Sequence, residues 1–111
     1  MRIEKFLPLG NLPFHVLVAL GDRVSHGYAI GKEIEERSDG RLRPTTGALY
    51  QALRRLQEQG LLEPADQPAD DNGDARRRYF RLTDLGREVA AAEARRLDRL
   101  VEAARSKRLL A

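Results

Sequence analysis

The sequence predicts a mainly α-helical domain with one small β-hairpin and a long C-terminal helix. Three observations lead to this fold class. The chain has 111 residues, which is the length of one domain. Four segments repeat apolar residues at the three- and four-residue spacing of a helix face. Between the third and fourth of these, a segment rich in Asp, Pro and Gly separates two short apolar runs, which is typical of a hairpin loop.

Two helices are expected in the first forty residues. The first is expected at 11–20, with Asn11 as its N-cap and Pro13 in its first turn. The second is expected to begin at Ser25 and to end at the Ser-Asp-Gly sequence of 38–40. Its buried face is expected to comprise Tyr28, Ala29, Ile30 and Ile34.

A third helix is expected to begin at the Pro-Thr-Thr sequence of 44–46 and to end at Gly60. Leu49, Leu53 and Leu56 recur at i, i+4 and i+7, which places them on one buried stripe. At 100° per residue, the opposite face is small and polar at its start and basic further along. That opposite face comprises Gly47, Gln51, Arg54, Arg55 and Glu58.

A hairpin is expected to follow the third helix. Its first strand is expected at 61–63, its exposed loop at 64–75 and its returning strand at 77–82. In the returning strand, the period of two places Phe80 and Leu82 on one face, and Tyr79 and Arg81 on the other. The second and third helices would then form a helix-turn-helix, with the hairpin as its wing.

The last helix is expected to begin after the cap Thr83 and to run for about 25 residues, or about 37 Å. So long a helix cannot be covered by the rest of a small domain, so its apolar stripe needs a partner. We therefore expect a winged helix-turn-helix domain at 1–82 and a dimerisation helix at 83–111, in one compact unit. The expected dimer interface comprises Leu12, Val16, Val89, Leu97, Leu100, Val101 and Ala104.

Positive charge is concentrated on two elements, although the net charge of the chain is only +3. Residues 41–60 carry four arginines against one glutamate, and 76–87 carry five arginines against one aspartate. These elements would face DNA in a winged helix, and arginine suits both phosphate and guanine edges. The alternative is that the arginines merely solvate a surface. The residues expected to contact DNA are Arg43, Thr45, Thr46, Gly47, Ala48, Tyr50, Gln51, Arg54, Arg55, Arg76, Arg77 and Arg78.

The hairpin tip is acidic and is expected to stay away from phosphate. It carries Asp66, Asp70, Asp71 and Asp74. The run 70–74 resembles a calcium loop, but aligning Gly73 with the loop glycine puts Pro68 and Tyr79 at ligand positions, so no calcium site is predicted. The chain has no cysteine and only two histidines, His15 and His26, without a metal-binding spacing. No catalytic constellation, metal site or cofactor is predicted, which argues against an enzyme.

Several segments together resemble the PadR family of bacterial transcriptional regulators. The similar segments are 26–30 (HGYAI), 46–56 (TGALYQALRRL), 60–62 (GLL) and 78–86 (RYFRLTDLG). The resemblance implies a DNA-binding homodimer that usually represses a nearby promoter, and the single last helix is similar to the short subgroup. Some members of that subgroup bind flat aromatic compounds with a tryptophan on the last helix, which this chain lacks. The Pro44-Thr45-Thr46 sequence also differs from the proline directly before glycine in many relatives.

The sequence therefore favours a sequence-specific, homodimeric transcriptional repressor that binds a near-palindromic double-stranded operator. The alternative is a winged-helix module that contacts proteins or ligands without binding DNA. A small apolar effector is a further expectation, in a pocket formed by Phe14, Val18, Leu97 and Val101, although these side chains would equally fill a solid interface. The longest apolar stretch, 16–20, is too short for a membrane span, and no signal peptide is visible. A cytoplasmic protein is expected.

Overall fold

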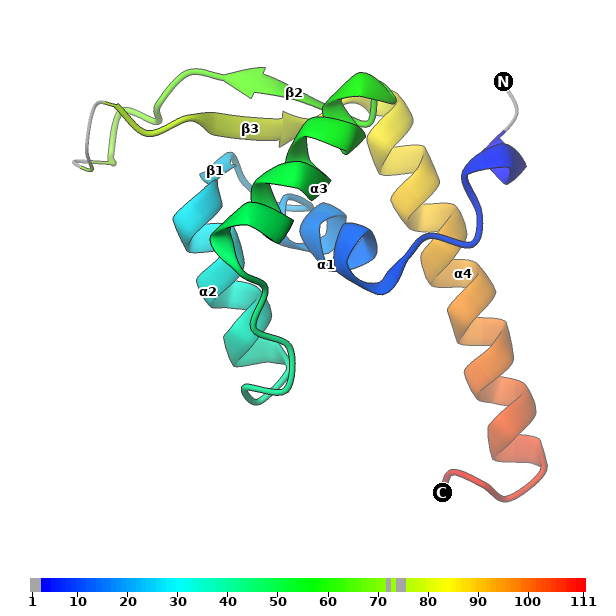
Figure 1. The fold of residues 1–111 in the computed structure, drawn as a ribbon. Helices are drawn as coiled ribbons and strands as arrows, with labels where there is room; N and C mark the ends of the chain where they lie inside the picture. Colours follow the sequence, from blue (N-terminus) through cyan, green and yellow to red (C-terminus); the bar gives the residue numbers. More distant parts are fainter. Residues whose placement is uncertain (1–2, 72, 74–75) are drawn as a thin grey trace.

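The computed structural model describes residues 3–71, 73 and 76–111. Figure 1 shows the order of its helices and strands. They are η1 (Ile3–Phe6), α1 (Asn11–Ala19), β1 (Ser25–His26), α2 (Gly27–Arg37), α3 (Thr46–Glu58), β2 (Leu62–Ala65), β3 (Tyr79–Leu82) and α4 (Asp84–Ser106). The described chain is mainly helical with one small antiparallel sheet and a long last helix, which confirms the predicted fold class.

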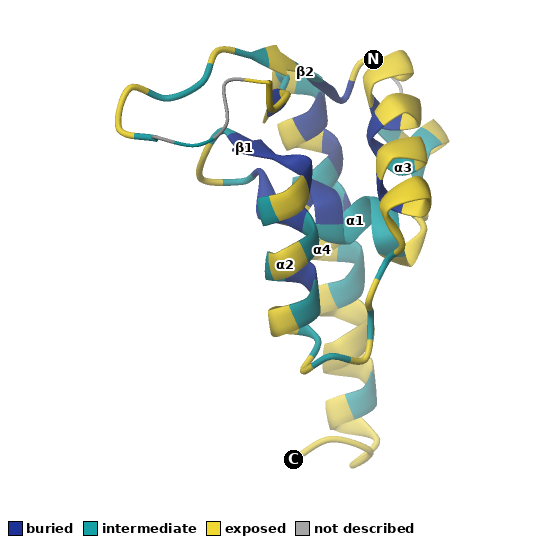
Figure 2. Cartoon of the chain, turned by 60° about the vertical axis from the view of Figure 1, so that its left-hand side comes forward, coloured by how far each residue is buried: buried dark blue, intermediate teal, exposed yellow. Residues whose placement is uncertain are grey.

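The core forms around α1, which contacts α2, α3 and α4. Leu17 of α1, Ile30 of α2, Leu53 of α3 and Val89 of α4 are all almost completely buried in it. Only the N-terminal half of α4 takes part in this core. The C-terminal half extends away from the other helices and is largely exposed (Figures 1 and 2).

The sheet has the strand order β1–β3–β2, with both pairs antiparallel. Leu62 faces Leu82 and Ala65 faces Tyr79 across the hairpin. The first strand therefore reaches two residues further than the predicted 61–63, and the returning strand begins at Tyr79 and not at 77. On its other side β3 pairs with Ser25 and His26.

This third strand corrects the prediction that the second helix begins at Ser25. Ser25 and His26 are extended and pair with β3, so α2 begins at Gly27. The ring Nδ1 of His26 accepts a hydrogen bond from the backbone N–H of Ala29 at 3.3 Å and caps the helix. Asn11 is likewise not the N-cap of α1. Gly10 takes that position without a side-chain bond, and Asn11 is the first helical residue.

One predicted burial position is wrong, and one strand is buried on both faces. Tyr28 is 67% exposed and does not belong to the buried face of α2. Tyr79 is buried together with its neighbour Phe80, although strict alternation would expose one of them. The reason is that β3 is the central strand, so that Tyr79 lies against the ring of His26, with centroids 5.2 Å apart.

The predicted boundaries of α3 and the start of α4 are confirmed. The Thr45 hydroxyl caps α3 by accepting from the N–H of Ala48 at 3.0 Å, and Gly60 follows the helix with φ +79°. The Thr83 hydroxyl caps α4 by accepting from the N–H of Gly86 at 2.9 Å. Local cap and stop signals fixed these ends.

Gly86 sets the distance between α4 and Leu61, in the turn that joins α3 to β2. A Cβ at this position would overlap the backbone carbonyl oxygen of Leu61. Because only glycine permits this approach, α4 can start directly against the β2 segment. Among the described residues, no helix combines the length and apolar character needed to cross a lipid bilayer.

Candidate nucleic-acid interface

The outer face of α3 is bare of other protein elements. Leu49, Leu53 and Leu56 are buried beneath it, as their spacing predicts. The other side of the helix is open to solvent along its whole length. Its exposed residues are Thr46, Gly47, Ala48, Tyr50, Gln51, Arg54, Arg55, Gln57 and Glu58. A helix with one polar, uncovered face and small residues at its start has the shape that fits a DNA major groove.

The turn before α3 is held by α2. The Ser38 hydroxyl accepts from the N–H of Leu42 at 2.9 Å, and Gly40 has φ +77°, so the chain reverses tightly there. Arg43 leaves this turn with an exposed side chain. Its Nε donates to the Gly40 carbonyl oxygen at 3.1 Å and lies 3.3 Å from a carboxylate oxygen of Glu35. Arg43 is thus held beside α2 at the entrance of α3.

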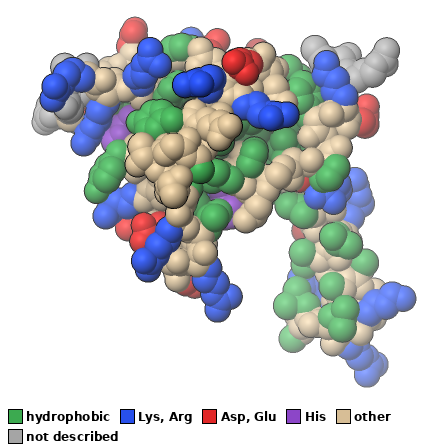
Figure 3. Space-filling model, in the orientation of Figure 1, with side chains coloured by type: hydrophobic (Ala, Val, Ile, Leu, Met, Phe, Trp, Pro, Cys, Tyr) green, Lys and Arg blue, Asp and Glu red, His purple; other side chains and the backbone are tan. Residues whose placement is uncertain are grey.

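A groove separates α3 from β3. Leu53 and Phe80 form part of its lining, and Arg54 and Arg78 approach it from the two elements. Figure 3 shows lysine and arginine side chains spread over the hairpin and α3 on this side of the molecule. Two separate stretches of sequence therefore bring arginines to one surface. Glu58 also lines the groove, at the C-terminal end of α3.

The hairpin tip is organised by Asp71. Its carboxylate accepts hydrogen bonds from the Tyr79 hydroxyl and from the backbone N–H of Gly73, the latter at 2.8 Å. The bond from Tyr79 lowers the pKa of Asp71 most, with the bond from Gly73 acting in the same direction. The same bond from Tyr79 to Asp71 raises the pKa of Tyr79. Asp71 is therefore a structural residue and not simply one of several repulsive acids.

The remaining wing residues frame this cluster. Arg77 lies 3.4 Å from the Nε2 atom of His26, and burial, followed by the charge of Arg77, lowers the pKa of His26. Arg76 and Arg78 are exposed, and Arg76 has an interaction partner. Asp74 lies outside the described residues. The wing base thus carries arginines, whereas Asp71 near its tip is tied back to β3 by Tyr79.

The predicted dimer residues fall into two groups. Val16 and Val89 are 0% exposed within the single chain, so they belong to its own core and offer no surface to a partner, which corrects that prediction. Leu100 and Val101 are 60% and 41% exposed on the free half of α4. Leu12, Leu97 and Ala104 are half-buried. Leu109 and Leu110 are exposed beyond the helix, and the sequence analysis did not include them.

The four residues of the predicted effector pocket lie on α1 and α4. Val18 and Val101 are exposed by 42% and 41%, and Phe14 and Leu97 are half-buried. A cavity between them requires a second copy of the chain, so the pocket remains a prediction. Among the described residues, no group of three His, Cys, Asp or Glu side chains is placed to hold a metal ion.

Sequence analysis missed one buried ionic group, Glu93 of α4. This residue is 1% exposed. One carboxylate oxygen accepts from the backbone N–H of Leu9 at 2.9 Å, and Arg96 pairs with the other at 2.5 Å. Hydrogen bonding from Arg96, and then from Leu9, lowers the pKa of Glu93 against the opposing effect of burial. Because a glutamate in a helix normally faces solvent, the position of Glu93 in the helical pattern did not predict its burial.

Comparison with known proteins decides the family. The sequence model described as the transcriptional regulator PadR-like family matches residues 16–92. This chain belongs to the PadR-like family. The match runs from α1 into α4, and the family is one of transcriptional regulators.

A curated relative of this PadR-like chain is an uncharacterized 37.1 kDa protein in transposon TN4556 of Streptomyces fradiae. The two are 44% identical over 85 residues, which is 77% of this chain. The chain spans only 22% of the length of that relative. The relative therefore contains a large part without a counterpart in this chain.

Two solved structures share the fold. A PadR family transcription regulator from Clostridium difficile R20291 has a TM-score of 0.72 at 21% identity, and the match covers 87% of this chain and 97% of that one. Bacillus subtilis PadR, solved in complex with operator DNA, has a TM-score of 0.62 at 19% identity, with 77% and 47% of the chains covered. These likenesses confirm the winged-helix fold of the PadR-like chain.

Proposed function

We propose that this PadR-like protein is a homodimer that binds a near-palindromic operator and represses transcription from it. The uncovered outer face of α3 is the observation that carries the proposal. Small side chains at the start of a recognition helix let it approach the major groove closely, and Gly47 and Ala48 supply them. Gln51 follows with an amide suited to an adenine edge, and Arg54 with a fork suited to guanine or phosphate.

The arginines of the wing base support the same surface. Arg78 approaches the groove beside Arg54, so a duplex seated on α3 would meet positive charge on both sides of that groove. Arg76 and Arg77 continue this charge along the hairpin. The acidic tip would lie outside the contact, because phosphate would repel it.

The free half of α4 supports dimerisation. Leu100, Val101, Leu109 and Leu110 expose apolar surface on a segment that the rest of the chain does not cover. Covering it with a second copy would remove this surface from water, at roughly 25 cal/mol per Å². A two-fold dimer would present two copies of α3, and half-sites about 34–36 Å apart would match them. Repression would follow when the dimer occupies a promoter.

We further propose that a small apolar effector binds at the dimer centre. Phe14, Val18, Leu97 and Val101 would line the dimer centre. A ligand held there can alter DNA affinity only if it prefers one spacing of the two α3 helices. A dimer structure whose centre is solidly packed around these side chains would remove the effector from the proposal and leave repression dependent on protein concentration alone.

The test is binding to the DNA upstream of the protein's own gene. Fluorescence anisotropy with labelled duplexes should find a near-palindromic segment that binds at least a thousandfold more tightly than scrambled DNA. Its affinity should fall steeply with salt, because several phosphate counterions are released. Equal, weak binding to every duplex at all salt concentrations would favour the alternative of a winged-helix module that contacts proteins or ligands.

A further inference from the structure

His26 connects the wing to the start of α2. Figure 1 shows β1 beside the hairpin, leading directly into α2. His26 is the last residue of β1, which pairs with β3, and the next residue begins α2. Its side chain is almost completely enclosed, since the residue is 8% exposed. Histidine is the side chain that titrates closest to neutral pH, so a histidine in this position can couple the attachment of the wing to protonation.

Both ring nitrogens of His26 face hydrogen-bond donors. The backbone N–H of Ala29 lies 3.3 Å from Nδ1, and the guanidinium Nη1 of Arg77 lies 3.4 Å from Nε2. A neutral imidazole has one nitrogen lone pair, so it accepts from one of these donors at a time, and a protonated ring accepts from neither. Neutral His26 therefore holds either the start of α2 or the wing base, whereas protonated His26 holds neither of them.

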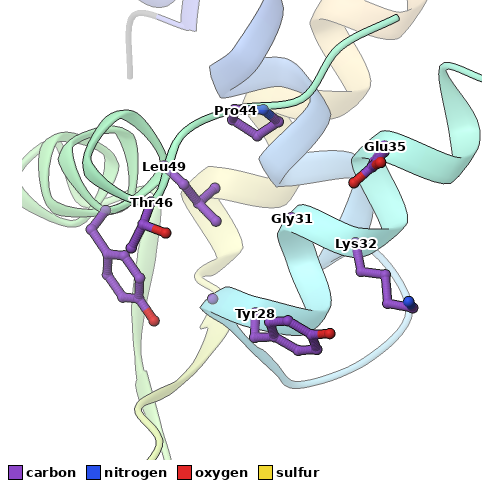
Figure 4. A pocket seen from close by; sticks show the side chains of 9 residues that line it. Tyr28, Gly31, Lys32, Glu35, Pro44, Thr46 and Leu49 are labelled. Atoms are coloured by element: carbon purple, nitrogen blue, oxygen red, sulfur yellow. The ribbon is translucent and has the colours of Figure 1, made fainter. Parts of the chain in front are cut away.

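Aromatic contacts keep the His26 ring between these two donors. The Tyr79 ring meets it edge-on, with centroids 5.2 Å apart and an interplanar angle of 79°. The Tyr28 ring is parallel to it, with centroids 6.4 Å apart. Figure 4 shows the Tyr28 side chain extending away from Thr46, so Tyr28 does not bridge to α3. The imidazole cannot turn to other partners without losing these two contacts.

The surroundings of His26 favour its neutral form. Burial lowers the pKa of His26 most, the charge of Arg77 lowers it further, and the carboxylate of Asp71 acts in the opposite direction. Asp71 already accepts two hydrogen bonds, so its charge is partly offset. The other charged side chains that line the same cleft, within the described part of the chain, are Asp22, Arg23 and Asp70. The first two form an exposed ion pair with each other.

We propose that His26 is a positioning residue that holds the wing against α2 only while its ring is neutral, so that protonation loosens the wing and weakens operator binding. The inference rests on the proposed function, in which Arg78 of the wing base meets DNA beside α3. Since the pKa of His26 is lowered where the wing is attached, protonation opposes attachment. The stabilisation is complete above the pKa of the released histidine and is lost as the pH falls through the lower pKa of the attached one.

The test is the pH profile of operator affinity, measured by fluorescence anisotropy with the full-length protein. Wild-type affinity should fall about fivefold between about pH 7.5 and about pH 5.5, which is the effect of losing one helix cap. His26→Asn keeps an oxygen that can cap α2 and does not titrate in this range, so its affinity should be the same at both pH values. His15→Asn is the matched control, because His15 is the other histidine and contacts Arg37 at the far end of α2. It should keep the wild-type profile.

An NMR titration of the free protein tests the role of His26 without DNA. As the His26 ring protonates, the amide of Ala29 should lose protection against hydrogen exchange. The heteronuclear NOE of residues 76–80 should fall over the same pH range, because the wing base becomes more mobile. Arg77→Gln should raise the pKa of His26, because it removes the neighbouring positive charge.

Unchanged or tighter operator binding by the wild type in acid would overturn the inference, as would an acid loss that persists in His26→Asn. A hairpin that stays rigid while His26 protonates would overturn it too, and this result does not depend on the folding of any variant. Absence of operator binding at neutral pH would instead overturn the proposed function, and the NMR titration would still decide whether His26 holds the wing.

Discussion

Replacing Glu93 should reveal how the N-terminal segment is attached to α4. The Glu93→Ala change removes a carboxylate that is 1% exposed, and with it the acceptor for the backbone N–H of Leu9. An unsatisfied, partly buried N–H costs about 1–3 kcal/mol. Arg96 also loses its partner, but its side chain is 38% exposed, so solvent offsets much of that loss. We expect a total of about 3 kcal/mol of unfolding free energy.

Glu93→Gln should be milder, because the amide oxygen can still accept from Leu9. We expect a loss of about 1 kcal/mol, since the charge assistance from Arg96 disappears. The pH dependence follows from the lowered pKa of Glu93. Its contribution is complete above the unfolded-state pKa and is lost as the pH falls through the lower folded-state pKa. The difference between wild type and Glu93→Gln should therefore shrink in acid.

The assay is urea unfolding followed by circular dichroism, at one protein concentration because a dimer would link stability to concentration. Amide hydrogen exchange of Leu9 should accelerate in Glu93→Ala. Glu102→Ala is the matched control on the same helix, since its side chain is 72% exposed and its pairing with Arg105 is loose, and it should unfold like the wild type. Unchanged unfolding of Glu93→Ala, or unchanged exchange at Leu9, would refute the reasoning.

Four further outcomes are expected. Gly47→Ala should keep or raise the stability of the protein, because an added Cβ has no neighbour within 4 Å. The same change should weaken operator binding in anisotropy titrations, and unchanged binding would place Gly47 outside the contact. Gly86→Ala should lower the unfolding free energy by about 3 kcal/mol in urea, because the Cβ meets the Leu61 carbonyl; wild-type stability would contradict this packing. Asp70→Asn should bind DNA at least as well as wild type, whereas Asp71→Asn should bind more weakly because it weakens the tie to Tyr79; the reverse order would be inconsistent with a structural Asp71. Removal of 97–111 should give a folded monomer in analytical ultracentrifugation, because the core lies before this segment; a dimer would show that α4 is dispensable for assembly.

Elements with local signals could be predicted from the sequence. Thr45 and Thr83 cap helices three residues ahead of their bonding partners, and Gly60 ends α3, so each signal lies within one turn of its effect. The β1 strand could not be predicted in this way. Its two residues are extended because they pair with Phe80 and Tyr79, more than fifty positions away. Pairing at that distance leaves no periodicity in so short a segment.

The candidate site likewise divides into residues that local patterns predict and residues that they do not. The periodicity of α3 was enough to separate buried leucines from exposed Gln51 and Arg54. Local sequence patterns were not enough to place Tyr28 of α2 or Asp71 of the hairpin, since the side-chain environment of each depends on a neighbouring element. Glu93 is the extreme case, because its partner Leu9 is 84 positions away. When the burial of a charged residue depends on so distant a backbone group, the sequence around that residue does not predict it.

The most direct test of the central claim is the salt-dependent affinity of Arg54→Ala for the operator. Arg54 is exposed on α3 beside the groove that Arg78 shares, and the change removes no core contact. Arg95→Ala, an exposed arginine of α4, provides the matched control. We predict that Arg54→Ala loses about 1–3 kcal/mol of operator binding while Arg95→Ala binds like the wild type. Equal affinity of Arg54→Ala and wild type at every salt concentration would contradict the assignment of α3 as the DNA-reading helix.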